Sequence, residues 1–282
     1  MRHSTVTERN PKAITRTEPT NLGFFAAAAR ALGQTGHRSE GAIGIVGGAD
    51  LFSGMLRQAQ ALLRWDRRAS YWSHAFLIAG PIAATPAAAA NTPLLECTLH
   101  PRPPAVHAPE RNGVTVGRLA NYPETMYPNA ALLSFQLSRD EITAILARAR
   151  DPNLDRLRFD LWDLLSLWRE YVWALGARLN PLLEGHRLFN VAYCELAYEA
   201  VGIDLTPGAS ERNSSPEHLW NTALWWWKPY EDTGHPIQVH AVIRQAGLPG
   251  SEALPPQISP EELAAPRGAP SADDRRRRRR AR

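Results

Sequence analysis

The chain has 282 residues, of which 44% are hydrophobic and 21% charged, so it carries enough apolar material to bury one sizeable core. Its net charge of +4 does not point to a nucleic-acid-binding surface, because residues 275–282 hold seven arginines and the rest of the chain has 25 basic against 28 acidic side chains. The two cysteines are too few for a disulfide framework, and no apolar run reaches the roughly 18 residues of a membrane span.

Composition divides the chain into three parts. Residues 1–40 are polar apart from one short Ala-rich helical stretch and are expected to form a flexible arm. Residues 41–246 alternate apolar patterns with turn signals and are expected to fold as one domain. Residues 247–282 are rich in Pro, Ala, Glu and Arg and are expected to be a disordered tail. The apolar residues 24–29 follow a long mixed-charge segment, unlike a signal peptide, so the expected compartment is the cytoplasm by default, with secretion by another route left open.

The pattern of residues 41–136 predicts short strands and one helix. Residues 41–51 mix glycine with branched apolar side chains, which predicts a strand that runs into a turn at Gly47-Gly48. Over residues 51–63 the apolar side chains recur at helical spacing. The apolar residues with this spacing are Leu51, Met55, Ala59, Leu62 and Leu63, and they predict a helix ahead of the histidine strand. Further strands are predicted at residues 73–78, 94–99, 114–118 and 130–136.

Helices dominate the second half. Ser138 and Glu141 have the spacing of a capping box ahead of an apolar stripe that ends near residue 150, and residues 160–175 have amphipathic spacing. A third helix is predicted from Cys194 to about residue 201, and a fourth opens with Pro216 at its first position. With one more strand at residues 237–242, these elements predict an α+β fold, a small antiparallel sheet with its helices grouped on one side.

A histidine, a carboxylate and a cysteine on these elements point to nucleophilic chemistry. His74 lies on an apolar strand, and Cys194 lies at the predicted start of a helix, where amide groups and a nearby base lower the pKa of a thiol. If the histidine strand and the strand at residues 94–99 pair as an extended hairpin, Glu96 can lie beside His74 while Cys97 points to the other face. Glu96 would then orient the imidazole and stabilise the imidazolium, with His100 as a rival for that role.

The order of these motifs resembles the circularly permuted papain-like amidases of the NlpC superfamily, the YaeF/YiiX-like branch, which is related to lecithin:retinol acyltransferase. In that family the histidine precedes the cysteine in the chain. The resemblance spans roughly residues 41–227 and departs from the family where Glu195 directly follows the cysteine in place of a serine. The matching segments are Gly-Ala-Asp50-Leu-Phe, Trp72-Ser73-His74-Ala-Phe-Leu-Ile, Leu-Leu-Glu96-Cys, Arg158-Phe159-Asp160-Leu161-Trp162, Val191-Ala192-Tyr193-Cys194-Glu195-Leu196, Gly202-Ile203-Asp204-Leu205 and Ser215-Pro216-Glu217-His218-Leu219.

The resemblance implies a permuted papain-like fold and a cysteine hydrolase that cleaves an amide, ester or thioester bond through an acyl-cysteine intermediate. Cys194 is then the nucleophile, His74 the general base and Glu96 the orienting carboxylate, with no cofactor and no metal. Tyr193 and Glu195 are expected at the oxyanion or substrate site, although Tyr193 could equally pack under the helix.

The expected partner is a peptide or lipid-type acyl substrate. No specific nucleic acid is expected, and the run from Arg275 to Arg280 would give only weak contact with an anionic surface. The alternative interpretation is a papain-like fold that has lost catalysis and acts as a binding module. A cysteine on an apolar helix is commonly a small buried hydrophobe, which is the basis of that alternative.

Overall fold

The computed structural model describes residues 18–64, 67–98, 113–151, 190–209, 214–225 and 237–245. Within them the chain forms a six-stranded, wholly antiparallel sheet in the order β4-β3-β2-β1-β5-β6, with helices packed on it, which confirms the α+β class. The strands are β1 (Ile43–Gly47), β2 (His74–Ile78), β3 (Pro93–Thr98), β4 (Gly113–Arg118), β5 (Asn129–Phe135) and β6 (Ile237–Ile243). Three predicted features lie outside the described residues: the helix at residues 160–175, the possible orienting residue His100, and the run from Arg275 to Arg280.

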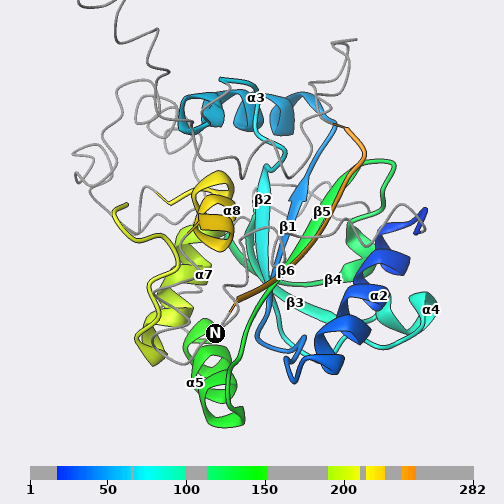
Figure 1. Ribbon diagram of the computed structural model, residues 1–282, viewed down its shortest axis with the longest axis vertical. Coiled ribbons are helices and arrows are strands. Elements are labelled where there is room, and N and C mark those ends of the chain that lie inside the picture. Colours follow the sequence, from blue (N-terminus) through cyan, green and yellow to red (C-terminus); the bar gives the residue numbers. More distant parts are fainter. Residues whose placement is uncertain are drawn as a thin grey trace, which may run out of the picture.

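Helices cover both faces of the sheet, which corrects the expectation that they would group on one side. Figure 1 shows α5 (Arg139–Ala149), α7 (Asn190–Tyr198) and α8 (Pro216–Trp225) on one side, and α2 (Asn21–Gln34) with the short α4 (Pro86–Ala89) on the other. The helix α3 (Leu51–Ala59), followed by the 3-10 turn η2 (Gln60–Leu63), lies across one end of the strands. Two further 3-10 turns are η4 (Leu119–Asn121) and η5 (Glu199–Val201).

The sheet separates two apolar clusters because successive side chains of a strand point to opposite faces. On the α7 face, the cluster takes in Ile43, Ile45, Ala75, Leu77, Leu95, Cys97, Val191 and Cys194. On the α2 face, it takes in Val46, Phe76, Ile78, Leu94, Phe24, Phe25 and Leu32. The strands β1, β2, β3 and β5 are therefore buried on both faces, which explains why they show little of the polar alternation of a half-exposed sheet.

Residues 18–40 belong to the folded domain, so the expectation of a flexible arm up to residue 40 is wrong for this part. Thr20 accepts a hydrogen bond from the amide of Gly23 and caps α2, and the helix buries Phe24, Phe25 and Leu32 without exposure. Phe24 and Phe25 are among the largest fully buried side chains, and they pack in the apolar cluster on the α2 face.

The helix predicted from the apolar spacing of residues 51–63 is confirmed as α3 and η2. Not all of the spaced apolar residues are buried: Leu51 and Met55 are 82% and 54% exposed, whereas Leu56 and Arg57 are buried. Asp50 caps this helix, its carboxylate accepting from the amide of Ser53 at 2.9 Å.

Local signals predicted several boundaries. The capping box of Ser138 and Glu141 is present at the start of α5, with both reciprocal hydrogen bonds formed. Gly202 has φ of 73° and ends the turn that follows α7, a conformation that favours glycine. Pro216 stands at the start of α8.

None of the helices in the described ranges combines the length and the apolar character needed to cross a bilayer.

Candidate functional site

His74 and Glu96 are joined in the interior, as the hairpin geometry predicted. The strands β2 and β3 pair through Leu77↔Leu95 and Ile78↔Leu94. Beyond these pairs, Nε2 of His74 lies 2.9 Å from a carboxylate oxygen of Glu96. Glu96 is fully buried and His74 is 7% exposed. A carboxylate this far from water needs such a partner, since an unpaired buried charge would be strongly destabilising.

Tyr122, which the sequence analysis missed, completes this pair. Its ring stacks on the imidazole of His74, with centroids 5.7 Å apart and planes inclined by 24°. Its hydroxyl donates a hydrogen bond to the same oxygen of Glu96 that meets His74. Tyr122 follows η4, 26 residues after Glu96, and no spacing rule connects the two residues. Only the crossing of this segment over the α2 face of the sheet brings them together.

Asn190, the first residue of α7, meets the other side of the imidazole. Its side-chain amide nitrogen lies 2.8 Å from Nδ1 of His74. Both ring nitrogens therefore have a partner, Glu96 at Nε2 and Asn190 at Nδ1. Asn190 is 3% exposed, and its side-chain oxygen is a buried atom for which the described structure provides no hydrogen-bond partner. Asn190 is not among the predicted site residues, because the helix predicted from the sequence starts four residues later, at Cys194.

Cys194 does not stand at the start of its helix, which corrects the prediction on which its activation rested. The helix α7 begins at Asn190, so Cys194 lies in the second turn and is fully buried in the cluster on the α7 face. Burial raises the pKa of the thiol, and the neighbouring Glu195, Cys97 and Glu96 raise it further. The amides that could lower the pKa of a thiol belong to the first turn, where the side chain is that of Asn190.

Tyr193 and Glu195 hold α7 in place rather than bonding to His74. The hydroxyl of Tyr193 donates to the carbonyl of Ala149, the last residue of α5, at 2.7 Å. Glu195 is 3% exposed and accepts from the backbone amide and hydroxyl of Thr206, at 3.1 and 2.6 Å, and from the hydroxyl of Ser214. Burial raises the pKa of Glu195 to about 7 against these hydrogen bonds, which act in the opposite direction.

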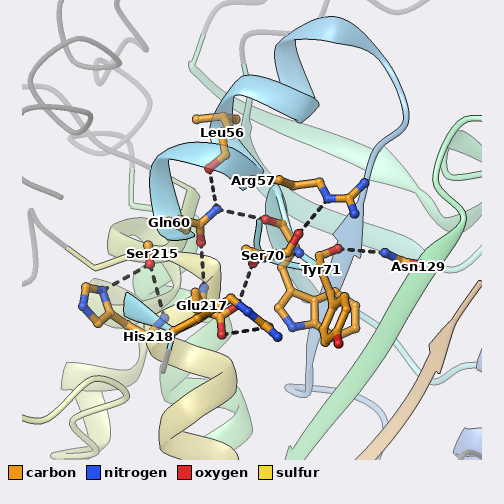
Figure 2. A network of polar contacts seen from close by, with 11 residues as sticks. Leu56, Arg57, Gln60, Ser70, Tyr71, Asn129, Ser215, Glu217 and His218 are labelled. Carbon is orange, nitrogen blue, oxygen red and sulfur yellow. Dashed lines mark hydrogen bonds and ion pairs between the residues drawn. The ribbon is translucent and has the colours of Figure 1, made fainter. Parts of the chain in front are cut away.

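A network of polar contacts holds the segment that leads into His74 (Figure 2). The guanidinium of Arg57 donates from Nε to the carbonyl of Ser70 at 2.8 Å, and the hydroxyl of Ser70 donates to Glu217 at 2.6 Å. The side-chain amide of Gln60 donates to the carbonyl of Trp72 at 2.9 Å. In turn, the backbone amide of Glu217 donates to Gln60 at 2.8 Å. The elements α3, η2 and α8 thus fix residues 70–72 immediately before the histidine.

Arg57 is the most buried cation of this network. It is 0% exposed, and burial lowers its pKa to about 10. It also donates to the carbonyls of Gly48 and Gln245, both at 3.1 Å, so the ends of β1 and β6 are tied to the same guanidinium. Gly47 allows the close approach of the histidine-bearing segment, because a Cβ at this position would meet the carbonyl oxygen of Tyr71 at 1.8 Å.

The described residues contain no group of three or more His, Cys, Asp or Glu side chains that could hold a metal ion. At this site the imidazole of His74 and the thiol of Cys194 are the candidates for proton transfer and nucleophilic attack.

The chain matches no family model, and no curated protein was found to be similar to it.

Proposed function

We propose that the chain is a cysteine hydrolase of the permuted papain-like kind, in which His74 is the general base, Glu96 its orienting carboxylate and Cys194 the nucleophile. The observation that supports this best is the buried contact of 2.9 Å between His74 and Glu96, with the first turn of the cysteine-bearing helix meeting the imidazole. Burying a histidine and a carboxylate together costs desolvation free energy, which other contacts must offset unless the pair is retained for a function.

The reaction is an acyl transfer to sulfur. The thiol proton of Cys194 passes to His74 while the sulfur forms a bond to the carbonyl carbon of an amide, ester or thioester. When the tetrahedral intermediate collapses, the bond to the leaving group breaks, and that group takes the proton from His74. Water then attacks the acyl-cysteine with His74 again as base, which releases the acid and restores the thiol.

Cys194 and His74 must come closer for this reaction. In the described conformation the thiol is covered and its raised pKa keeps it protonated. Asn190 and Cys194 are four residues apart in α7 and so lie on the same side of the helix, with their Cβ atoms about 5–6 Å apart. A shift of the first turn of α7 would bring the thiol toward Nδ1 of His74, with the side chain of Asn190 remaining beside that nitrogen. The proposed enzyme is therefore closed at rest.

The substrate class that the family resemblance favours is a peptide or lipid acyl group, and we place the protein in the cytoplasm by default. Weak contact of the Arg275–Arg280 run with an anionic surface is part of the same proposal, as is the absence of a specific nucleic-acid partner.

Alkylation of the two cysteines tests the mechanism. Iodoacetamide at pH 6, with the sites identified by mass spectrometry, should modify Cys194 much faster than the equally buried Cys97, and His74→Gln should remove this difference. The glutamine retains a hydrogen-bonding group for Glu96, so the fold is preserved. Cys194→Ala and His74→Gln should each abolish turnover of ester and amide substrates with little change in the thermal midpoint.

A second candidate function is a binding module on the same fold. The full burial of Cys194 in the apolar cluster favours it, because a covered, protonated thiol packs as a small hydrophobe. Equal and slow alkylation of Cys194 and Cys97, unaffected by His74→Gln, would support the binding module and contradict the hydrolase.

A further inference from the structure

The arrangement around His74 identifies which ring nitrogen takes up a proton. The carboxylate of Glu96 can only accept, so Nε2 carries the hydrogen in the neutral ring and donates it to Glu96 over 2.9 Å. The lone pair is then on Nδ1. That atom accepts from the side-chain amide of Asn190, 2.8 Å away, so Asn190 lies at the position through which a proton must arrive.

The side-chain oxygen of Asn190 supports the same assignment independently. It is buried and has no hydrogen-bond partner in the part of the chain that the structure describes, although a buried oxygen of this kind normally has one. Protonation of Nδ1 converts this nitrogen from an acceptor into a donor. Rotation of the amide about its terminal torsion would then present the oxygen to the new N–H, and the oxygen would gain the partner that it lacks.

Among the described residues, no other side chain contacts Nδ1 of His74. Glu96 comes from β3, and Tyr122 stacks on the ring face and donates to Glu96. Phe76, on the same strand, lies with its ring centroid 6.1 Å from that of His74. Asn190 is thus the polar group placed to respond to a change in the charge of the ring, and it lies one helical turn from Cys194.

We propose that Asn190 is a positioning residue that holds neutral His74 with its lone pair on Nδ1 and, by turning its amide, accepts a hydrogen bond from the protonated ring. Nδ1 is then the proton-accepting atom of the site. This inference rests on the proposed function for its role in the reaction, but the hydrogen-bond exchange itself requires no substrate.

Nitrogen NMR of protein labelled with ¹⁵N-histidine tests the exchange, with the His74 signals identified by their loss in His74→Gln. In the neutral ring of the wild type, Nε2 should carry the hydrogen and Nδ1 the lone pair. Asn190→Asp has the same shape, but its carboxylate can only accept a hydrogen bond, so its Nδ1 signal should move toward that of a protonated ring nitrogen. Asn91→Asp is the matched control, since Asn91 is exposed and its side chain faces Arg118; it should leave both signals unchanged.

Asn190→Leu supplies a test that adds no charge. Its Nδ1 signal should move toward the position of a ring nitrogen with an unbonded lone pair, and a wild-type-like signal would contradict the proposal. A wild-type ring protonated on Nδ1 alone, or an Asn190→Asp ring whose Nδ1 signal stays at the wild-type position, would also overturn it. If Cys194 proves inert to iodoacetamide but the nitrogens respond to residue 190, the hydrolase is refuted and the positioning role stands. If Cys194 is reactive but the ring nitrogens do not respond to substitution of residue 190, the hydrolase is supported and the positioning role of Asn190 is refuted.

Discussion

Glu96 is the residue on which the site depends most directly. One of its oxygens meets both Nε2 of His74 and the hydroxyl of Tyr122. These contacts satisfy a charge that has no access to water, and they hold the imidazole in one orientation. The geometry thus makes Glu96 a hydrogen-bonding partner of the histidine, while the rival candidate His100 lies outside the described residues.

Glu96→Gln should retain the hydrogen bonds of the site but remove the charge that balances an imidazolium. Acyl transfer should fall by about 10²–10⁴-fold, because the amide can orient the ring without stabilising its protonated form. The measurement is kcat/KM together with the pH profile of Cys194 alkylation. Tyr122→Phe is the matched comparison: it keeps the stacked ring and loses one hydrogen bond, and its effect should be about tenfold or less. Superimposable alkylation profiles for wild type and Glu96→Gln would refute the orienting role.

At the scale of the element, α7 is positioned by side chains that were expected to serve chemistry. Tyr193 ties it to the end of α5, and Glu195 ties it to Thr206 and Ser214 in the segment that follows. The helix starts at Asn190 rather than at Cys194, so the first-turn amides are displaced from the thiol. The position of the site therefore follows from how α7 is anchored along its length.

Glu195→Gln should change how stability depends on pH. The folded-state pKa of Glu195, about 7, is above its unfolded value of about 4.5, so the protonated form contributes stability that is complete below pH 4.5 and is lost as the pH rises through 7. Because glutamine does not titrate, the variant should lose this decline, which thermal unfolding between pH 4.5 and 8 would detect. Ser214 can rotate its hydroxyl to accept from the new amide.

Glu195→Leu is the contrasting variant. It leaves the donors of Thr206 and Ser214 without their acceptor and should reduce the free energy of unfolding by about 1–3 kcal/mol at every pH in this range. If Glu195→Gln and wild type lost stability equally between pH 4.5 and 8, the carboxylate would not be the titrating group.

For the molecule as a whole, three wholly or partly buried histidines should reduce stability at acid pH. Burial lowers the pKa of His240 to about 4, with the nearby His37 as a further cause, and burial also lowers the pKa of His37 and brings that of His218 to about 4. His240 lies on β6 opposite Leu132, on the face that α2 covers, and His37 follows α2 and meets Ser134 of β5 at 3.3 Å. Protonation would place charges between α2 and the sheet.

The stability that these histidines contribute should therefore fall as the pH drops from 6.5 to 4, opposite in sign to the contribution of Glu195. The unfolded chain takes up protons near pH 6.5, whereas the folded chain resists protonation until about pH 4, so the loss sets in below the unfolded pKa and is complete at the folded one. The expected loss is on the order of 1–3 kcal/mol for each of His240 and His218. Measured by denaturant unfolding at pH 4, 5, 6 and 7, His240→Gln should lose less stability than wild type as the pH falls, and equal changes in the two proteins would contradict the expectation.

Several parts of this architecture follow from local features of the chain. Alternation along a strand puts His74 and Phe76 on one face and Glu96 on the opposite face from Cys97, whatever the rest of the fold does. The capping box at Ser138 and the stop at Gly202 depend on hydrogen bonds and backbone angles within a few residues, and both are present. For the same reason, the strands and helices of the described segments lie close to their predicted positions.

Long-range packing decided the rest. The burial of Arg57 and the exposure of Leu51 and Met55 depend on where α3 meets the ends of the strands, and hydrophobicity along the helix does not contain that information. Tyr122 and Asn190 reach His74 from segments 48 and 116 residues away, so their roles arise only when the sheet order and the anchoring of α7 are established. Sequence periodicity specifies which side of an element a residue faces, but the partner that it meets is determined by the tertiary arrangement, because those contacts form between elements that the chain does not connect directly.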